Sequence, residues 1–327
     1  MKYRVLGKSG IKVSALGIGC MGMSPGMYGE VNVEQSKKTL LRAFECGINF
    51  FDTADVYGVG HNEELIGKIL KPLRDQIIIA TKCGVVADTN GLSRNGSKKH
   101  IKQACESSLK RLDISKIDVY YLHRVDPLIP VEESMQAMSE LYHEGKIISV
   151  GLSEVDADII KRANAIFPVT AVQSEYSILF REAAEQVLPI CSALNIAFVP
   201  HSPVGRGFLS GIIKSIEQLD PNDYRRGLTY FHDDNITNNL QLVHSLARIS
   251  KRHQMTPIQI ALAWLLAQDN QIIPIPGTTK INHLLENIES VDVSLGELEL
   301  EELNVASQQN LVKGTRYIEA LKGWFVE

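Results

Sequence analysis

The stretch that decides the fold is residues 147–173, IISVGLSEVDADIIKRANAIFPVTAVQ. It begins and ends with short apolar runs, 147–151 and 169–173, and between them, at 156–166, apolar residues recur with a helical period. A strand, a helix and a second strand in this order form a βα unit whose two strands lie parallel in one sheet. Each run is almost continuously apolar, which is typical of strands that are covered on both faces.

The same alternation extends along most of the chain in both directions. The expected strands are 15–19, 48–51, 77–81, 117–122, 147–151, 169–173, 196–200 and 271–275. The expected helices are 33–46, 62–71, 98–111, 131–144, 156–166, 182–194, 239–254 and 281–289. Eight strands, each followed by a helix, predict a closed (β/α)₈ barrel, the TIM-barrel fold, and a single domain over 1–327.

Further segments are expected around this barrel. YRVL and IKVS, on either side of Gly7 to Gly10, predict a β-hairpin that caps one end. Residues 202–238 form a long connection with little periodicity, and connections of this length are usually functional, so we expect it to cover a cofactor. Additional C-terminal helices are predicted at 257–268, at ELELEELNVAS (297–307) and in the tail 315–327.

Composition excludes several classes of protein. The 327 residues are 44% hydrophobic, as in an ordinary globular protein, and the net charge of −4 gives no overall positive field for nucleic acid or an anionic membrane. The five cysteines are far apart and include no CxxC pair, so we expect inert thiols rather than disulfides or a zinc site. The N-terminus has no apolar signal core, and no apolar run approaches the length of a membrane span. A cytoplasmic location is therefore expected, and the oligomeric state stays open.

One glycine-rich motif is typical of a different fold. Residues 17–22, GIGCMG, match the GxGxxG pattern of a Rossmann dinucleotide site. In that motif the last glycine lies in the first turn of a helix, whereas here Pro25 and Gly26 follow and helical periodicity begins only near residue 33. No acidic residue ends a second strand about 20 positions further on, because Asp52 is thirty beyond Gly22. The context is against a Rossmann site.

Polar side chains follow three consecutive expected strands at the point where each strand ends. Asp52 ends the second strand and leads into FDTADVYG, which contains Tyr57, while Lys82 and His123 end the third and fourth. Each has an ordinary structural explanation when taken alone, as a loop cap, a half-buried aromatic, a solvated lysine or a core histidine. Because active sites of these barrels lie at the C-terminal ends of the strands, the four are expected to converge on one rim.

Their chemistry suits proton transfer to a carbonyl group. A lysine directly after a buried strand needs a partner, which Asp52 can supply. The Lys82 ammonium would favour ionisation of the Tyr57 phenol, and a tyrosine tuned in this way can act as a general acid. His123 is placed to donate a second hydrogen bond to the oxygen on which charge develops.

Seven motifs resemble those of the aldo-keto reductase superfamily, in order and over nearly the whole chain. They are FDTADVYG, ATKCG, LHRVD, SVGLSE, VQSEYSIL, HSPVGRGFLSG and IPGTTK. The opening LGKSGIKVSALGIGCMGMS is similar to that of a group of bacterial, fungal and plant members. The resemblance implies an NADP-dependent oxidoreductase that reduces an aldehyde or ketone to an alcohol with NADPH. It also implies a catalytic tetrad of Asp52, Tyr57, Lys82 and His123, with Tyr57 as proton donor and no metal.

The resemblance also assigns a cofactor site. It implies that Ser153 and Gln173 hold the nicotinamide carboxamide and that Tyr176 stacks on the nicotinamide ring. The pyrophosphate would lie on backbone amides of the loop that contains Ser202, Pro203, Val204, Gly205, Gly207 and Leu209. After the eighth strand, the 2′-phosphate and adenine of NADPH would be bound by Gly277, Thr278, Thr279, Lys280, His283, Glu286 and Asn287.

Two positions depart from the family pattern. Glu154 stands where many members have asparagine, and a carboxylate can accept a hydrogen bond from the carboxamide but cannot donate one. His283 stands where the family often has an arginine for the 2′-phosphate, which leaves Lys280 with more of the preference for NADPH and makes use of NADH conceivable. If Lys280 does not hold the phosphate, Arg206, Arg225 and Arg226 are the alternatives.

Two functions other than carbonyl reduction are alternatives for a barrel of this kind. A cofactor-binding, essentially non-catalytic ancillary subunit of the same fold stays open, because a complete tetrad does not exclude it. A metal-dependent barrel hydrolase is disfavoured, because no HxH pair follows the first strand. The pocket for the carbonyl substrate is expected near Met23, Tyr28, Arg124, the loop 206–238 and the C-terminal tail.

Overall fold

Seven parallel strands form one curved sheet at the centre of the molecule. The structure, a computed structural model, describes residues 1–26, 28, 31–89, 91–308, 312–318, 321, 323 and 324. The strands are β3 (Ile18–Gly19), β4 (Phe50–Asp52), β5 (Ile78–Cys83), β8 (Ile117–Leu122), β9 (Ile147–Ser153), β10 (Val169–Glu175) and β11 (Ala197–His201). They lie in this order, with every neighbouring pair parallel. The predicted barrel order is confirmed.

The segment expected as the eighth strand closes the barrel without forming a regular ladder. On one side the amide of Ile273 donates to the carbonyl of Phe198 in β11 at 2.8 Å. On the other side the amide of Gly17 donates to the carbonyl of Pro274 at 2.9 Å. Pro274 and Pro276 have no N–H, so neither can donate toward β3, and the segment is joined to it by an isolated bridge.

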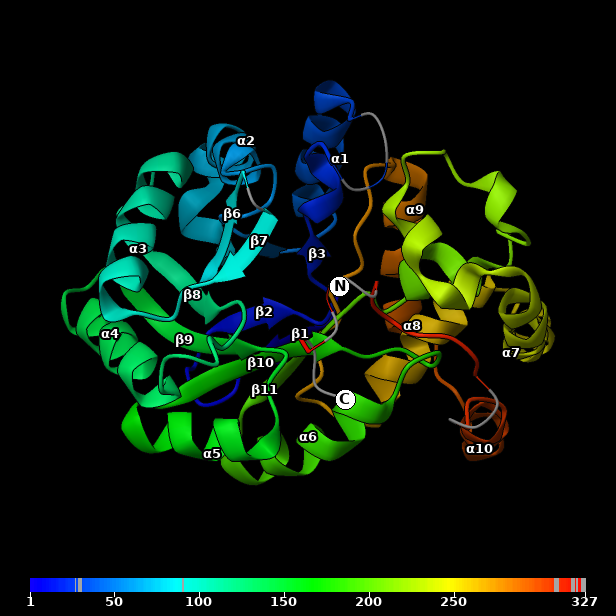
Figure 1. Cartoon of the computed structure of the whole chain (residues 1–327). Helices are drawn as coiled ribbons and strands as arrows, with labels where there is room; N and C mark the ends of the chain where they lie inside the picture. The colour runs from blue at the N-terminus through cyan, green and yellow to red at the C-terminus, as the bar shows by residue number, and fades with distance from the viewer. Residues whose placement is uncertain are drawn as a thin grey trace.

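Ten α-helices are present among the described residues, and most surround the strands (Figure 1). They are α1 (Val33–Glu45), α2 (His61–Leu70), α3 (Lys98–Leu112), α4 (Val131–His143), α5 (Ala157–Ile166), α6 (Glu182–Leu194), α7 (Asp233–His253), α8 (Pro257–Gln268), α9 (Ile281–Glu289) and α10 (Glu297–Ala306). Most bounds agree closely with the predicted ones. Helix α7 begins at Asp233 rather than at 239. Of residues 234–238 only Ile236 is buried, so these polar first turns show no apolar period in the sequence.

The predicted N-terminal hairpin is present. Strands β1 (Tyr3–Val5) and β2 (Lys12–Ser14) pair antiparallel. Leu6 after β1 and Val13 within β2 have no exposed surface and join the cluster of apolar side chains inside the barrel. The hairpin therefore caps the end of the barrel opposite the C-terminal ends of the strands.

Three segments differ from expectation or add to it. An unpredicted hairpin, β6 (Val85–Asp88) with β7 (Gly91–Arg94), follows β5. The connection after β11 contains four short 3₁₀ turns, η3 (Gly205–Ser210), η4 (Ile216–Gln218), η5 (Tyr224–Gly227) and η6 (Thr229–Phe231). Residues 315–318 are not helical, so the expected tail helix 315–327 is wrong for them, and much of the remaining tail lies outside the described residues.

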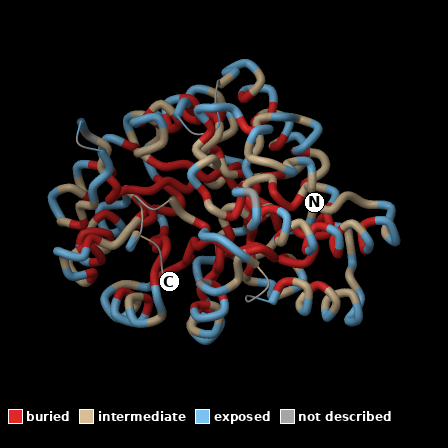
Figure 2. The backbone as a smooth tube through the Cα atoms, turned by 45° about the vertical axis from the view of Figure 1, so that its right-hand side comes forward, coloured by how far each residue is buried: buried red, intermediate tan, exposed pale blue. Residues whose placement is uncertain are grey.

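Alternate residues of each strand point into the barrel. Below the rim these are apolar and fully buried: Phe50, Ala80, Val119, Tyr121, Ala171, Ala197 and Val199. Continuing the same alternation toward the C-terminal end of each strand gives Asp52, Lys82, His123, Ser153, Gln173, Glu175 and His201. The buried centre and the exposed outer turns are visible in Figure 2. The inward polar positions therefore share one end of the barrel.

The cysteines and helices agree with two further expectations. All five thiols are free, four of them are buried, and burial raises the pKa of Cys105 and Cys191 to about 12, so these two are poor nucleophiles. None of the described helices is long and apolar enough to span a lipid bilayer.

Candidate active site

The predicted tetrad is brought together at the rim. The Lys82 ammonium forms an ion pair with Asp52 at 2.5 Å and donates to the Tyr57 Oη at 3.3 Å. It also donates to the carbonyl of Thr53 at 2.8 Å. The Lys82 side chain has no exposed surface and that of Asp52 is 3% exposed, so the pair is buried. Burial opposes the charge of Lys82, but Asp52 and Tyr57 outweigh it and raise the pKa of Lys82, which keeps the ammonium protonated.

Tyr57 does not have the lowered pKa expected from its lysine neighbour. Burial raises the pKa of Tyr57, Lys82 lowers it by a smaller amount, and Asp52 raises it again. The expected influence of Lys82 is present, but it does not prevail over desolvation. The phenol therefore stays protonated at neutral pH, which is the state that a proton donor needs.

His123 lies beside Tyr57, with the two rings edge to face and their centroids 5.8 Å apart. Burial lowers the pKa of His123 well below its usual value, and the charges of Arg124, Lys82 and His201 lower it further. The imidazole is thus neutral, and its Nδ1 has no hydrogen-bond partner among the described residues. A neutral imidazole donates one hydrogen bond, so the expected role as a donor is chemically available.

Ser153 and Gln173 also lie at this rim, but both already have protein partners. Arg124 Nη1 donates to Ser153 Oγ at 3.0 Å and to the carbonyl of His123, which joins β9 to the end of β8. Gln173 Nε2 donates to Asp52 Oδ2 at 2.7 Å. Gln173 therefore orients the carboxylate that pairs with Lys82, a contact that the sequence did not indicate.

Tyr176 does not lie at the rim, and its expected stacking on the nicotinamide ring has to be corrected. Its ring is 2% exposed and packs against Phe198 and Trp264, with centroids 5.9 and 5.5 Å away. The reason is the alternation of the strand. Gln173 points inward, so a residue three positions later lies on the outer face, between the sheet and its helices.

His201 is the aromatic side chain that occupies the rim at the end of β11. It follows the inward residues Ala197 and Val199 at the same spacing of two. Its Nε2 lies 2.8 Å from Glu154 Oε1 and its Nδ1 lies 3.2 Å from Ser202 Oγ. Motif matching missed His201, although the period of the strand predicts an inward position for it.

Glu154, the first departure from the family pattern, is turned toward the protein. Its carboxylate accepts the backbone amide of Glu175 at 2.7 Å and contacts His201 and Arg316. The side chain has no exposed surface. Its hydrogen-bonding capacity is therefore already engaged, so the expectation that it receives the cofactor amide has no support in this geometry.

The loop after β11 contains the predicted pyrophosphate residues in a tight sequence of turns. Ser202, Arg206 and two glycines have positive φ, with Gly205 at 57° and Gly207 at 91°. The amides of these glycines donate to carbonyls within the loop at 2.9 and 3.1 Å, so the glycines form the turn rather than present their own N–H groups. Pro203, Gly205 and Leu209 are buried, and Val204 is half-buried.

The residues predicted for the phosphate and adenine lie around the start of α9. Thr278 Oγ1 accepts the amide of Lys280, the N-cap residue of α9, at 3.0 Å, and Thr39 Oγ1 donates to the carbonyl of Thr279 at 2.8 Å. Gly277, Lys280 and His283 are exposed, Thr278, Thr279 and Glu286 are half-buried, and Asn287 is buried. A helix N-terminus with an exposed lysine is a favourable place for an anion.

The alternative phosphate-binding arginines are engaged within the protein. Arg206 forms a two-point ion pair with Glu175. Arg225 contacts Asp223 and the carbonyl of Arg206, and Arg226 donates to two backbone carbonyls of the long connection. Lys280 therefore remains the favoured candidate.

A parallel barrel with a buried lysine, carboxylate and histidine and a half-buried tyrosine at the C-terminal ends of its strands defines a (β/α)₈-barrel protein with a candidate active site at its rim. The profile of the aldo/keto reductase family matches residues 15–307, and the chain belongs to that family. Members of the family are oxidoreductases that act on carbonyl compounds and generally use a nicotinamide cofactor.

Individual proteins that are similar to this chain in sequence or structure include members of the same family. The chain is 43% identical over 319 residues to a protein described as probable aldo-keto reductase 1 from Glycine max, covering 97% of this chain and 92% of that one. An aldo-keto reductase from Bacillus halodurans, solved in its holo form, is 29% identical, with a TM-score of 0.75 over 98% of this chain and 99% of the other. A glycerol dehydrogenase from Gluconobacter oxydans, at 23% identity, shares the fold, with a TM-score of 0.85 over 93% and 94%.

Proposed function

We propose that this protein reduces an aldehyde or ketone to an alcohol with NADPH, and that Tyr57 gives the proton. The observation that carries the proposal is the buried Lys82 ammonium, held by Asp52 and 3.3 Å from the Tyr57 hydroxyl. A nicotinamide cofactor, when bound, supplies the hydride that adds to the carbonyl carbon.

Tyr57 protonates the carbonyl oxygen as negative charge develops there. Its raised pKa keeps the proton in place until the substrate binds, and burial is the main cause of that shift. Once the proton leaves, the phenolate lies next to the Lys82 ammonium in a site of low dielectric, where that contact is strongest. Asp52 holds the ammonium, and Gln173 holds Asp52.

His123 supplies the second donor to the same oxygen. Because the imidazole is neutral, it donates a hydrogen bond without bringing a positive charge that would bind anions in place of the substrate carbonyl. The edge-to-face arrangement with Tyr57 supports a shared target for the two side chains.

Several described residues fit a dinucleotide cofactor. The turns at Gly205 and Gly207 form a compact loop next to the rim, and Lys280 stands exposed at the entrance of α9 for the 2′-phosphate. For the nicotinamide ring we assign the stacking surface to His201, since its ring lies at the rim and Tyr176 is packed elsewhere. Ser153 remains the proposed partner of the carboxamide.

The decisive experiment compares the native protein with Tyr57→Phe over a panel of aldehydes and ketones, following NADPH absorbance. The variant keeps the ring but loses the proton donor, so turnover should fall by roughly 10²-fold or more while the NADPH dissociation constant stays the same. Tyr142→Phe is a matched control, because that tyrosine lies half-exposed on α4 and should not affect turnover.

Three other outcomes would count against the proposal. Turnover by Tyr57→Phe at nearly the native rate would refute the assignment of the proton donor. Tight binding of NADPH without turnover of any carbonyl compound would favour the non-catalytic ancillary subunit. Equal use of NADH would overturn the NADPH preference.

A further inference from the structure

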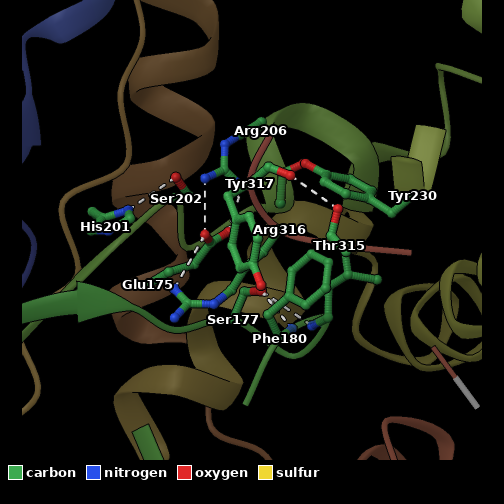
Figure 3. Close-up of polar contacts among 12 residues, drawn as sticks. Glu175, Ser177, Phe180, His201, Ser202, Arg206, Tyr230, Thr315, Arg316 and Tyr317 are labelled. Carbon is green, nitrogen blue, oxygen red and sulfur yellow. Dashed lines mark hydrogen bonds and ion pairs between the residues drawn. The ribbon is translucent and has the colours of Figure 1, made fainter. Parts of the chain in front are cut away.

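Five charged or titratable side chains form an ion network beside the rim, here defined as Glu154, Glu175, His201, Arg206 and Arg316. Arg206 binds Glu175 through two contacts, one of them at 2.9 Å, and Arg316 lies 3.8 Å from the same carboxylate. Figure 3 shows Glu175 between the two guanidinium groups. Arg316 also reaches Glu154 at 3.1 Å, and Glu154 contacts His201 at 2.8 Å.

The carboxylates and guanidinium groups of the ion network are buried, while the side chain of His201 is 21% exposed. The side chains of Glu154 and Glu175 have no exposed surface, and those of Arg206 and Arg316 are 7% and 9% exposed. Buried charges are tolerated when they are paired, and removal of one partner leaves a charge that the interior cannot solvate. The two carboxylates and two guanidinium groups are balanced as they stand.

Backbone strain is concentrated at the same place. In the part of the chain that the structure describes, seven non-glycine residues have positive φ, and three of them, Asp113, Asn195 and Gln254, simply end helices. Among the other four, Glu154 and Arg206 belong to the ion network, and Ser202 contacts His201. Such strain persists only where the surroundings impose it, and it is typical of functional sites.

The ion network joins segments that are remote in sequence. Arg316 comes from the C-terminal segment 312–318, Glu154 from the end of β9, Glu175 from β10, and Arg206 from the loop after β11. The segment is seated against α7 and η6. Asn239 exchanges two hydrogen bonds with the backbone of Lys313, at 2.7 and 2.8 Å.

A second set of contacts runs from the same segment to the loop. The amide of Thr315 donates to Thr229 Oγ1 at 2.7 Å. Gly314 has a φ of 95° and lies so close to Tyr230 that a Cβ there would come within 2.4 Å of its backbone nitrogen. Tyr230 in turn donates to the carbonyl of Gly205 at 3.3 Å. The C-terminal segment thus reaches the loop 202–211 through Tyr230 as well as through Glu175.

We propose that Arg316 is a positioning residue of the cofactor site: by completing the ion network it fixes the loop 202–211 and the rim at Glu154 and His201 in the shape that binds the cofactor. The inference rests on the proposed function, because it assumes that this loop and rim hold the nicotinamide half of the cofactor. It makes the C-terminal segment 312–318 part of the site.

The expected signature is a loss that does not distinguish the two cofactors. In Arg316→Met the loop and rim lose one of the two guanidinium groups that pair with the carboxylates, whereas Lys280 near the proposed 2′-phosphate is untouched. The dissociation constants of NADPH and NADH should both rise, by the same factor of about 3 to 30. Arg316→Lys, which keeps the charge, should recover most of the affinity.

A pH profile separates positioning through the ion network from a general loss of packing. Burial acts to raise the pKa of Glu154, but His201, Arg316 and Arg124 outweigh it and hold that pKa well below its usual range. Glu175 on β10 contributes its amide to the same carboxylate. Without Arg316 the pKa of Glu154 rises, so Glu154 becomes protonated on acidification and its uncompensated charge disappears. The defect in cofactor binding should therefore shrink as the pH falls by about three units, from pH 8 to pH 5.

The experiment titrates each cofactor by fluorescence into the native protein, Arg316→Met and the double variant Arg316→Met/Glu154→Gln. The double variant should lose the pH dependence and regain most of the affinity, because it removes the uncompensated carboxylate. Arg162→Met is the matched control, since Arg162 forms an exposed pair with Glu132 on the outer helices and should bind both cofactors like the native protein.

The outcomes are distinct. If the native protein binds neither cofactor, the proposed function fails. If it binds them and a folded Arg316→Met does so equally well at every pH, this inference alone is refuted. A defect confined to NADPH, or one that Glu154→Gln does not relieve, also refutes it. Arg316→Gln, which keeps a donor without the charge, replaces Arg316→Met with the same expectations if the methionine variant does not fold.

Discussion

The pair of Lys82 and Asp52 allows a double-mutant cycle whose size follows from burial. With side chains 0% and 3% exposed, neither group can reach water when its partner is removed. In Lys82→Met, the Asp52 carboxylate keeps the amide of Gln173 but loses its counter-charge, and breaking a buried pair in this way costs about 3–5 kcal/mol. Asp52→Asn leaves the ammonium similarly unbalanced, with the Thr53 carbonyl as a remaining acceptor.

The double variant Asp52→Asn/Lys82→Met removes both charges together, so it should be more stable than the sum of the single effects predicts. We expect a coupling free energy of about 2–3 kcal/mol from urea unfolding of all four proteins, with similar slopes against denaturant. The exposed pair of Arg42 and Glu45 provides the control cycle and should show no measurable coupling. Single effects that add to within about 0.5 kcal/mol would refute the idea that Lys82 and Asp52 are a buried, mutually dependent pair.

Three further predictions concern other parts of the site. Lys280→Met should raise the NADPH dissociation constant about tenfold and leave that of NADH unchanged, and equal weakening of both would place the 2′-phosphate elsewhere. Tyr176→Ala should destabilise the fold by about 3–5 kcal/mol in urea unfolding, as a core truncation does, and selective loss of cofactor affinity at native stability would contradict this. Burial, followed by the charge of Glu63, raises the pKa of Asp55 to about 8, so native Asp55 is protonated and its stabilising effect is lost as pH rises. Asp55→Asn should therefore gain stability over the native protein from pH 5 to 8, by at most about 1.4 kcal/mol per pH unit, and a parallel pH dependence would disprove the shift.

The barrel could be predicted because its evidence is local. Each strand is a short apolar run and each helix repeats apolar residues with its own period, so the alternation gives the fold without any long-range information. The hairpin β6–β7 was missed because the apolar run of β6 is short and because β7 is polar apart from Leu92, which is 48% exposed. The start of α7 was misplaced for a similar reason, since its first turns are polar.

Site residues at the ends of strands could be predicted from the sequence, whereas one in the C-terminal segment could not. Asp52, Lys82 and His123 end consecutive strands with the inward parity, so sequence position alone brings them together. The prediction that Tyr176 stacks on the nicotinamide ring was wrong because it followed a motif and not the inward parity of the strand. The same parity selects His201. Arg316 could not have been found, because nothing in a tail without periodicity indicates which strand ends it will reach.

The segment that closes the barrel, 271–276, contains two prolines, so hydrogen bonds across its junction with β3 are few. Across this junction, the amides of Gly17 and Gly19 donate to the carbonyls of Pro274 and Pro276 at 2.9 and 3.4 Å, neither proline can donate in return, and β3 itself is only two residues long. Along β5, β8 and β9, by contrast, neighbouring strands pair in regular ladders. Local opening is favoured where few backbone bonds hold two elements together. Local opening of the native barrel should therefore occur first between β3 and the closing segment, next to the loop after the eighth strand. The amide hydrogens of Gly17 and Gly19 should then exchange with solvent faster than those in β5 and β8.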